Sequence, residues 1–69
     1  MKEGDTITII PSFRLYEMHL EHLIRHSMNV VEIVRYSNGK IDGCVASLAD
    51  EQSSEKQQWF VPYESIFMI

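Results

Sequence analysis

Three histidines give the chain its first candidate for metal chemistry. His19, His22 and His26 stand three and four residues apart, so on a helix they would form one stripe. Imidazoles spaced in this way can share a Zn²⁺ ion. A zinc site also needs converging ligands held by further hydrogen bonds, and we expect Glu17 and Glu21 to point away from the stripe. The sequence therefore favours a half-exposed helix flank over a metal site, with a pH-responsive surface as another alternative.

Aromatic residues near the C-terminus are the second candidate. Trp59 and Phe60 are adjacent, so in a strand they point to opposite faces, and one of them is expected to be exposed. Exposed aromatics beside Pro62 could form a shallow groove for a peptide. The competing interpretation, which a small core favours, is that Trp59 covers the open end of a barrel or packs under the helix. The candidate residues for binding a partner are Tyr36, Trp59, Pro62 and Tyr63.

Enzyme chemistry finds no support in the sequence. Cys44 is the only cysteine, and we expect it to be a small buried hydrophobe because it lies opposite Ile33 on the apolar face of its hairpin. No basic neighbour in the hairpin lowers its pKa, so we do not expect a nucleophile. None of the carboxylates forms a convincing acid–base pair with a nucleophile. We therefore predict a protein that is not an enzyme and holds no cofactor.

Length and charge narrow the class of protein. The 69 residues make one domain, residues 1–69, and carry six basic and ten acidic residues for a formal net charge of -4. Nucleic-acid binding draws on many clustered Lys and Arg side chains, so this balance argues against it. No apolar run approaches the roughly 20 residues that span a bilayer. A lone cysteine and an N-terminus without a signal-peptide pattern predict a cytoplasmic protein.

The chain must position these residues with few elements. Residues 6–10 alternate polar and apolar side chains and predict a strand that ends at Pro11. Residues 13–27 predict one helix of about three turns, with Ser12 as its N-cap and with a buried stripe; the alternative is a long loop with a single helical turn. That stripe would hold Phe13, Tyr16, Leu20, Leu23 and Ile24.

Residues 28–48 give the strongest structural signal, because Asn38-Gly39 between two apolar runs is typical of a two-residue type I′ hairpin. This turn fixes a register, with Gly43 as a bend or bulge. The predicted cross-strand pairs are Tyr36–Ile41, Arg35–Asp42, Val34–Gly43, Ile33–Cys44 and Val31–Ala46. The predicted core face holds Val31, Ile33, Cys44, Ala46 and Leu48.

The remaining residues complete the predicted sheet. Residues 49–56 are polar and predict a loop, residues 57–61 a strand, and residues 62–65 a tight or 3₁₀ turn. Residues 66–69 are apolar and predict a short last strand beside the first one. The alternative for these four residues is homodimerisation through an edge strand.

The order of these segments resembles a known family. A GDTITIIP strand, a VVEIV strand, an NG turn and a terminal WFVPYESI resemble small bacterial SH3-like barrels of the KOW type. The resemblance implies a mainly β fold, a five-stranded SH3-like barrel with one short helix between its first two strands. The chain departs from the family pattern in two ways. The basic residues by which KOW domains bind RNA are sparse, and residues 25–28 lack the usual glycines.

No motif identifies a reaction or a ligand, so the functional prediction is general. We expect a small non-enzymatic module that docks a protein partner. An accessory protein of the KOW kind that associates with nucleic acid is the alternative, and metal binding by the three histidines is a weaker one.

Overall fold

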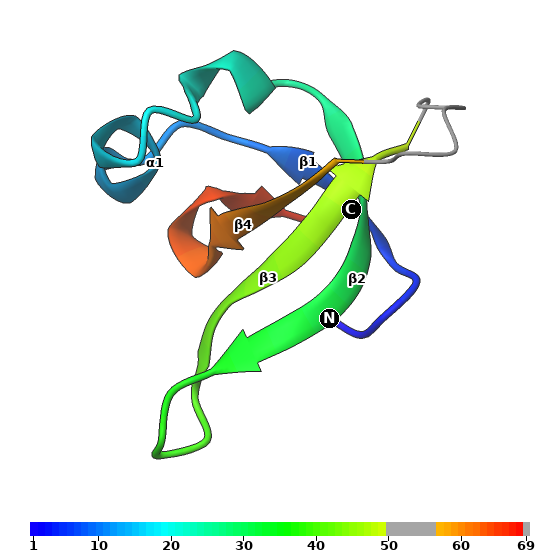
Figure 1. Ribbon diagram of the computed structural model, residues 1–69, viewed down its shortest axis with the longest axis vertical. Helices are drawn as coiled ribbons and strands as arrows, with labels where there is room; N and C mark the ends of the chain where they lie inside the picture. Colours follow the sequence, from blue (N-terminus) through cyan, green and yellow to red (C-terminus); the bar gives the residue numbers. More distant parts are fainter. Residues whose placement is uncertain (50–56, 69) are drawn as a thin grey trace.

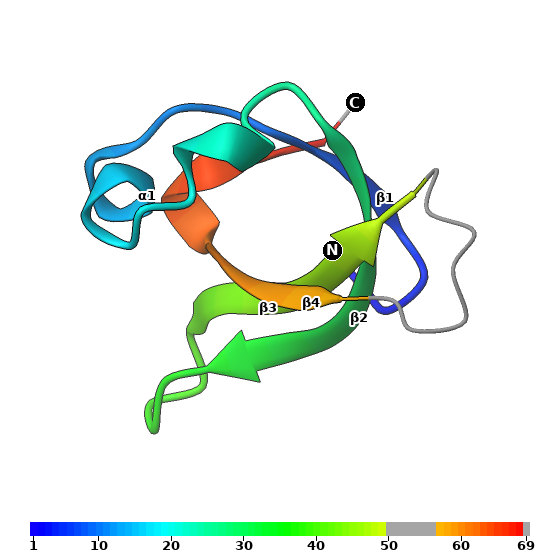
Figure 2. The ribbon, with the colours of Figure 1, turned by 45° about the horizontal axis from the view of Figure 1, so that its top comes forward.

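Five antiparallel strands in one sheet organise the part of the chain that the structure describes, residues 1–49 and 57–68 of a computed structural model (Figure 1). The sheet has the order β4-β3-β2-β1-β5, and in a second view it curls around an interior (Figure 2). The prediction of a mainly β fold is confirmed. The edge strands β4 and β5 do not pair with each other in the described ranges, so the sheet is not closed. The strands are β1 (Thr6–Ile9), β2 (Ser27–Arg35), β3 (Ile41–Leu48), β4 (Gln58–Pro62) and β5 (Ile66–Phe67).

The segment between β1 and β2 is not the single helix of about three turns that the sequence predicted. It forms α1 (Phe13–Glu17), of five residues, and a 3₁₀ turn, η1 (Glu21–Leu23). The predicted N-cap is confirmed, because the Leu15 amide donates a 3.2 Å hydrogen bond to Ser12 Oγ. In the described residues no helix is long and apolar enough to cross a membrane.

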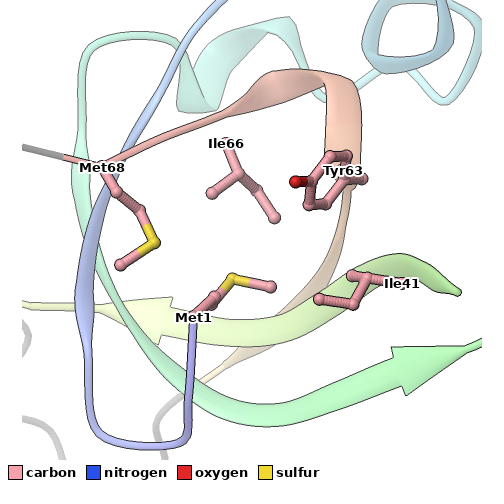
Figure 3. Close-up of a pocket in the computed structure, with 5 residues that line it drawn as sticks. All are labelled: Met1, Ile41, Tyr63, Ile66 and Met68. Atoms are coloured by element: carbon pink, nitrogen blue, oxygen red, sulfur yellow. The ribbon is translucent and has the colours of Figure 1, made fainter.

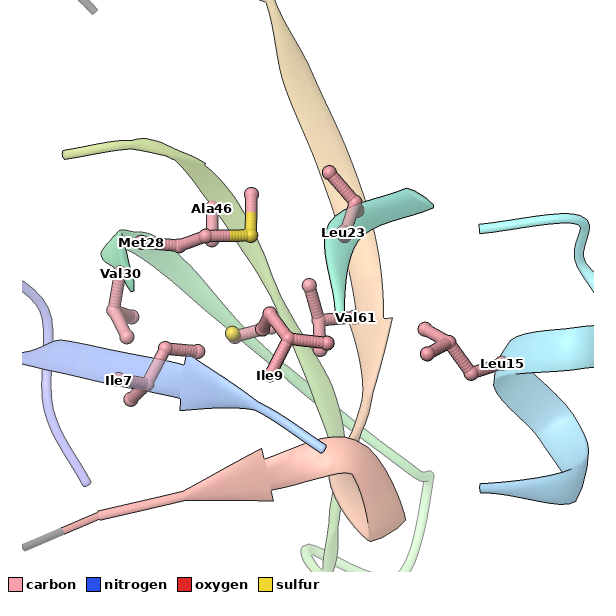
Figure 4. Packing of buried hydrophobic residues seen from close by; sticks show 9 residues of the cluster. Ile7, Ile9, Leu15, Leu23, Met28, Val30, Ala46 and Val61 are labelled. Carbon is pink, nitrogen blue, oxygen red and sulfur yellow. The ribbon is translucent and has the colours of Figure 1, made fainter. Parts of the chain in front are cut away.

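A Schellman motif ends α1, with His19 in the left-handed conformation at φ 59. The His19 amide donates to the Tyr16 carbonyl at 3.0 Å, and the Leu20 amide donates to the Leu15 carbonyl at 3.1 Å. A continuous helix would separate Leu15 from Leu23 by about 12 Å along its axis. The break instead lets both leucines enter one core, from α1 and from η1 (Figure 4).

The hairpin turn is longer than predicted. The Gly39 amide donates to the Tyr36 carbonyl at 2.9 Å, and the Tyr36 amide donates to the Lys40 carbonyl at 2.8 Å. Gly39 has φ 88, whereas Asn38 has no positive φ, so a type I′ turn is excluded. The pattern is a type I turn closed by a left-handed glycine, which makes a three-residue loop.

The longer turn changes the register at the turn end of the hairpin. The predicted pairs Val34–Gly43 and Ile33–Cys44 are confirmed. Arg35 pairs with Ile41, so the predicted pairs Arg35–Asp42 and Tyr36–Ile41 are wrong, and Asp42 is left over as a bulge beside Gly43.

A second bulge lies at the other end of β2. Val30, not Val31, is opposite Ala46, so the predicted pair is wrong by one residue. Val31 is the extra residue and is 40% exposed, whereas Val30 is buried. One added residue exchanges the faces of a strand, which explains why Val31 does not belong to the core face.

Side chains from α1, η1 and the four longer strands form the core (Figure 4). Cys44 and Ala46 are buried as predicted, and Ile33 and Leu48 are partly buried against the cluster. The buried apolar residues are Ile7, Ile9, Leu15, Leu23, Met28, Val30, Cys44, Ala46 and Val61.

The C-terminal elements agree with the sequence. β4 is followed by a 3₁₀ turn, η2 (Tyr63–Ser65), and then by β5. β5 pairs with β1 through Ile9–Ile66 and Thr8–Phe67, so the predicted strand beside the first one is confirmed. The predicted loop lies almost wholly outside the described residues, which omit 50–56, and the predicted end of the last strand at 69 lies outside them too.

The left-handed His19 predicts a stabilising substitution. His19→Gly should raise the free energy of unfolding by about 0.5–1 kcal/mol, because glycine adopts positive φ without the steric cost of a Cβ atom. Met18→Gly is the matched control, since Met18 has φ -86 and gains nothing from glycine. Chemical denaturation measures both, and a loss of stability in His19→Gly would contradict the Schellman geometry.

Candidate functional site

A small pocket opens where the two ends of the described chain meet η2 and the start of β3. Its volume is about 230 Å³, and Figure 3 shows its side chains around one opening. Ile41 begins β3, Tyr63 begins η2 and Ile66 begins β5. The pocket is lined by Met1, Ile41, Tyr63, Ile66 and Met68.

The pocket lining is suited to apolar contact. Four of its five side chains are purely apolar or thioether groups, and the Tyr63 hydroxyl is the polar exception. Tyr63 is 52% exposed and Met68 is 42% exposed, so the rim is open to a binding partner. Pockets for small molecules begin at about 300 Å³. The volume here is closer to that of one large side chain, and methionines adapt easily to different apolar shapes.

The candidate residues near the C-terminus divide between pocket and core. Tyr63 reaches the pocket, but Pro62 is fully buried opposite Gly43 and does not reach the surface. Trp59 is half-buried against the core, and its ring lies edge-on to the ring of His22 at 6.2 Å between centroids. The structure therefore brings one of these three residues to an open surface.

Tyr36, the fourth candidate, lies instead beside an ion-pair cluster centred on Arg14. Arg14 Nη2 is 3.0 Å from Asp42 Oδ1, and Arg14 Nη1 is 3.2 Å from Glu64 Oε1. The Arg14 guanidinium also lies 5.9 Å from the centre of the Phe60 ring. This cluster ties α1 to the β3 bulge and to η2.

The sequence predicted a different partner for Asp42. Arg35, expected opposite it, donates from Nη1 to the Gly39 carbonyl at 2.8 Å and stabilises the hairpin turn instead. The sequence alone does not predict the contact between Arg14 and Asp42, because the two residues are far apart in the chain and meet only through tertiary packing.

Hydrogen bonding to Asp42 dominates the titration of this cluster. It is the largest cause that raises the pKa of the Tyr36 phenol, and likewise the largest that raises the pKa of Arg14. Asp42 Oδ1 is buried and accepts no hydrogen bond of normal geometry from the described residues, although Arg14 is close to it. The ion pair with Arg14 is thus what compensates this oxygen for its lost hydration.

The three histidines do not form a helical stripe. α1 ends at Glu17, so His19 lies in the left-handed turn, His22 in η1 and His26 just before β2. Within residues 1–49 and 57–68, no group of three or more His, Cys, Asp or Glu side chains is placed to hold a metal ion.

Cys44 lies in the core as a free thiol. Burial raises its pKa to about 11. A thiol with this pKa is almost wholly protonated at neutral pH, so it is a poor nucleophile.

Two exposed aromatic residues are ones that the sequence placed on a buried stripe. Phe13 is 80% exposed and Tyr16 is 51% exposed, so that prediction is wrong for both. α1 buries Leu15, on its opposite side. The prediction assumed one continuous helix and so placed these residues on one stripe. The structure divides the segment between two separate turns, α1 and η1.

Removal of the Asp42 charge should lower the pKa of Tyr36. In Asp42→Asn the phenol no longer bonds to a carboxylate, so Tyr36 should lose its proton at a lower pH than in the unmodified chain. NMR titration of the tyrosine ring signals measures this, with Tyr63 as the internal control. An unchanged Tyr36 titration would show that Asp42 does not hold the phenol.

Comparison with protein-family models, with curated proteins and with solved structures gave no match to this chain. The geometry described above is therefore what bears on function.

Proposed function

We propose that this chain is a small SH3-like barrel that docks a protein partner, without catalysis, by taking one apolar side chain into the pocket at Tyr63. The carrying observation is the pocket itself, with a volume of about 230 Å³ and mainly apolar side chains that line it beside a nearly equal polar surface.

The strand order supports the SH3-like part of the proposal. Four strands follow one another through β4, a 3₁₀ turn then comes before the last strand, and that strand returns to pair with β1. The five strands and the short helix between the first two were expected from the resemblance to KOW-type barrels. Fold alone does not give function, so the functional part rests on the pocket.

The rim of the pocket supports a macromolecular partner over a small ligand. Tyr63 and Met68 leave 52% and 42% of their surface exposed around one opening. Aromatic and methionine side chains are enriched at protein interfaces. A partner that inserts one anchor would cover this rim at the same time.

The alternative role, as an accessory of nucleic acid, rests on the hairpin tip. Arg35 and Lys40 are exposed there, no acidic residue lies between residues 33 and 41, and the hairpin extends beyond the other strands (Figure 1). Two cations on a chain of net charge -4 offer few phosphate contacts. Protein docking is therefore the proposal that we favour.

Peptides selected from a random displayed library test the pocket. We expect them to share one large apolar residue and to shift the NMR methyl signals of Ile41, Ile66 and Met68. Tyr63→Asp should weaken their binding at least about tenfold, because it puts a charge where an apolar anchor is buried. Val31→Asp, an exposed apolar residue outside the pocket lining, should leave binding unchanged.

Two results would contradict protein docking at this pocket. One is peptide binding that Tyr63→Asp leaves intact. The other is an empty selection together with binding of single-stranded RNA that weakens steeply as salt rises, which would favour the nucleic-acid alternative. Methionine signals that move on dilution of the chain alone would instead show that a second copy fills the pocket.

A further inference from the structure

We propose that the outer face of α1 is a second docking surface, which binds a basic segment of a protein through the rings of Phe13 and Tyr16 and the carboxylate of Glu17. This surface lies on α1 and shares no residue with the Tyr63 pocket. The inference therefore goes beyond the proposed function and can fail separately from it.

The geometry of α1 places these three side chains together. At 100° per residue, Phe13, Tyr16 and Glu17 share one side of the helix, and Leu15 points the opposite way into the core. Phe13 and Tyr16 are one turn apart, so their side chains are neighbours. Phe13 is 80% exposed, the largest value among the exposed large hydrophobic residues in the described ranges.

Folding does not account for this exposed pair. α1 is capped by the Ser12 side chain and anchored by Leu15, Arg14 and the Schellman turn, none of which uses the Phe13 or Tyr16 ring. An aromatic side chain left in water forgoes about 1.5–3 kcal/mol of burial energy. Single exposed apolar side chains are common on protein surfaces, so the charges beside this pair are needed to indicate a partner.

The charges around the pair select the chemistry of the partner. Arg14, the basic residue of α1, points to Asp42 and Glu64 and is occupied there. Glu17 and Glu21 are exposed, and neither makes an ion pair within the part of the chain that the structure describes. Two ring faces beside the unpaired Glu17 carboxylate attract a guanidinium or an ammonium group by cation–π and ionic contacts together.

A basic segment of another protein fits this surface better than a second copy. A contact between α1 and the basic tip of a second copy, at Arg35 and Lys40, would join two different surfaces, so it would form a reciprocal dimer, a closed ring or an open chain. The net charge of -4 also repels a second copy while it attracts a basic partner.

A matched pair of blocked peptides tests the surface. The probe is Gly-Leu-Arg-Leu-Gly, and its control carries citrulline, which has the same shape without the charge, in place of arginine. We expect the arginine peptide to shift the amide NMR signals of residues 13–17 at millimolar concentration. Glu17→Gln and Phe13→Ala should each weaken binding of the arginine peptide by roughly two- to fivefold. The citrulline peptide should bind the unmodified chain no more tightly than the arginine peptide binds these two variants.

The controls separate this surface from the pocket and from misfolding. Glu3→Gln removes an exposed carboxylate elsewhere and should leave binding unchanged, as should Tyr63→Asp. Circular dichroism should show all variants folded, because Phe13 and Glu17 are exposed. Equal binding of both peptides, shifts confined to the Tyr63 pocket, or unaltered binding by Glu17→Gln would each overturn the proposal.

Discussion

The close approach of β4 to β3 at Gly43 is the constraint on which the other surfaces depend. A Cβ atom at Gly43 would overlap the carbonyl oxygen of Val61 and lie 2.8 Å from Cζ of Phe60. With Phe60 lying across this glycine, Arg14 can reach both the ring and Asp42. Arg14 in turn holds α1 and η2 to the sheet. The pocket and the outer face of α1 are thus placed by one contact between two backbones.

The bulge at Asp42 acts together with this glycine. An added residue reverses the faces of a strand, so Ile41 lines the pocket while Asp42 faces Arg14 and Tyr36. A regular hairpin would have paired Asp42 with Arg35 and left Arg14 without its main partner. The irregular turn at Gly39 is therefore part of how the chain separates an apolar pocket from a charged cluster.

Local signals in the sequence predicted the strands, but the irregular positions required tertiary information. The Asn38-Gly39 pair, the Ser12 cap and the strand before Pro62 each depend on near neighbours, and the hairpin, the cap and β4 were found where expected. The two bulges depend on which side chains must face the core. Of the candidate site, Tyr63 was predicted from its place in the last turn. The exposure of Phe13 was not predicted, because the apolar pattern of a helix continues in the sequence past the real end of α1.

The most direct measurement is the stability of Gly43→Ala compared with that of Gly39→Ala. A Cβ atom at Gly39 would meet no neighbouring atom, so alanine there is strained only by the positive φ of this position. Gly39→Ala should therefore lower the free energy of unfolding by about 1 kcal/mol. Gly43→Ala must push β4 away from β3, so it should lower the free energy of unfolding by about 2–3 kcal/mol. It should also shift the NMR signals of Ile41 and Arg14. A Gly43→Ala chain as stable as Gly39→Ala, with unchanged signals at both residues, would contradict the central role of this contact.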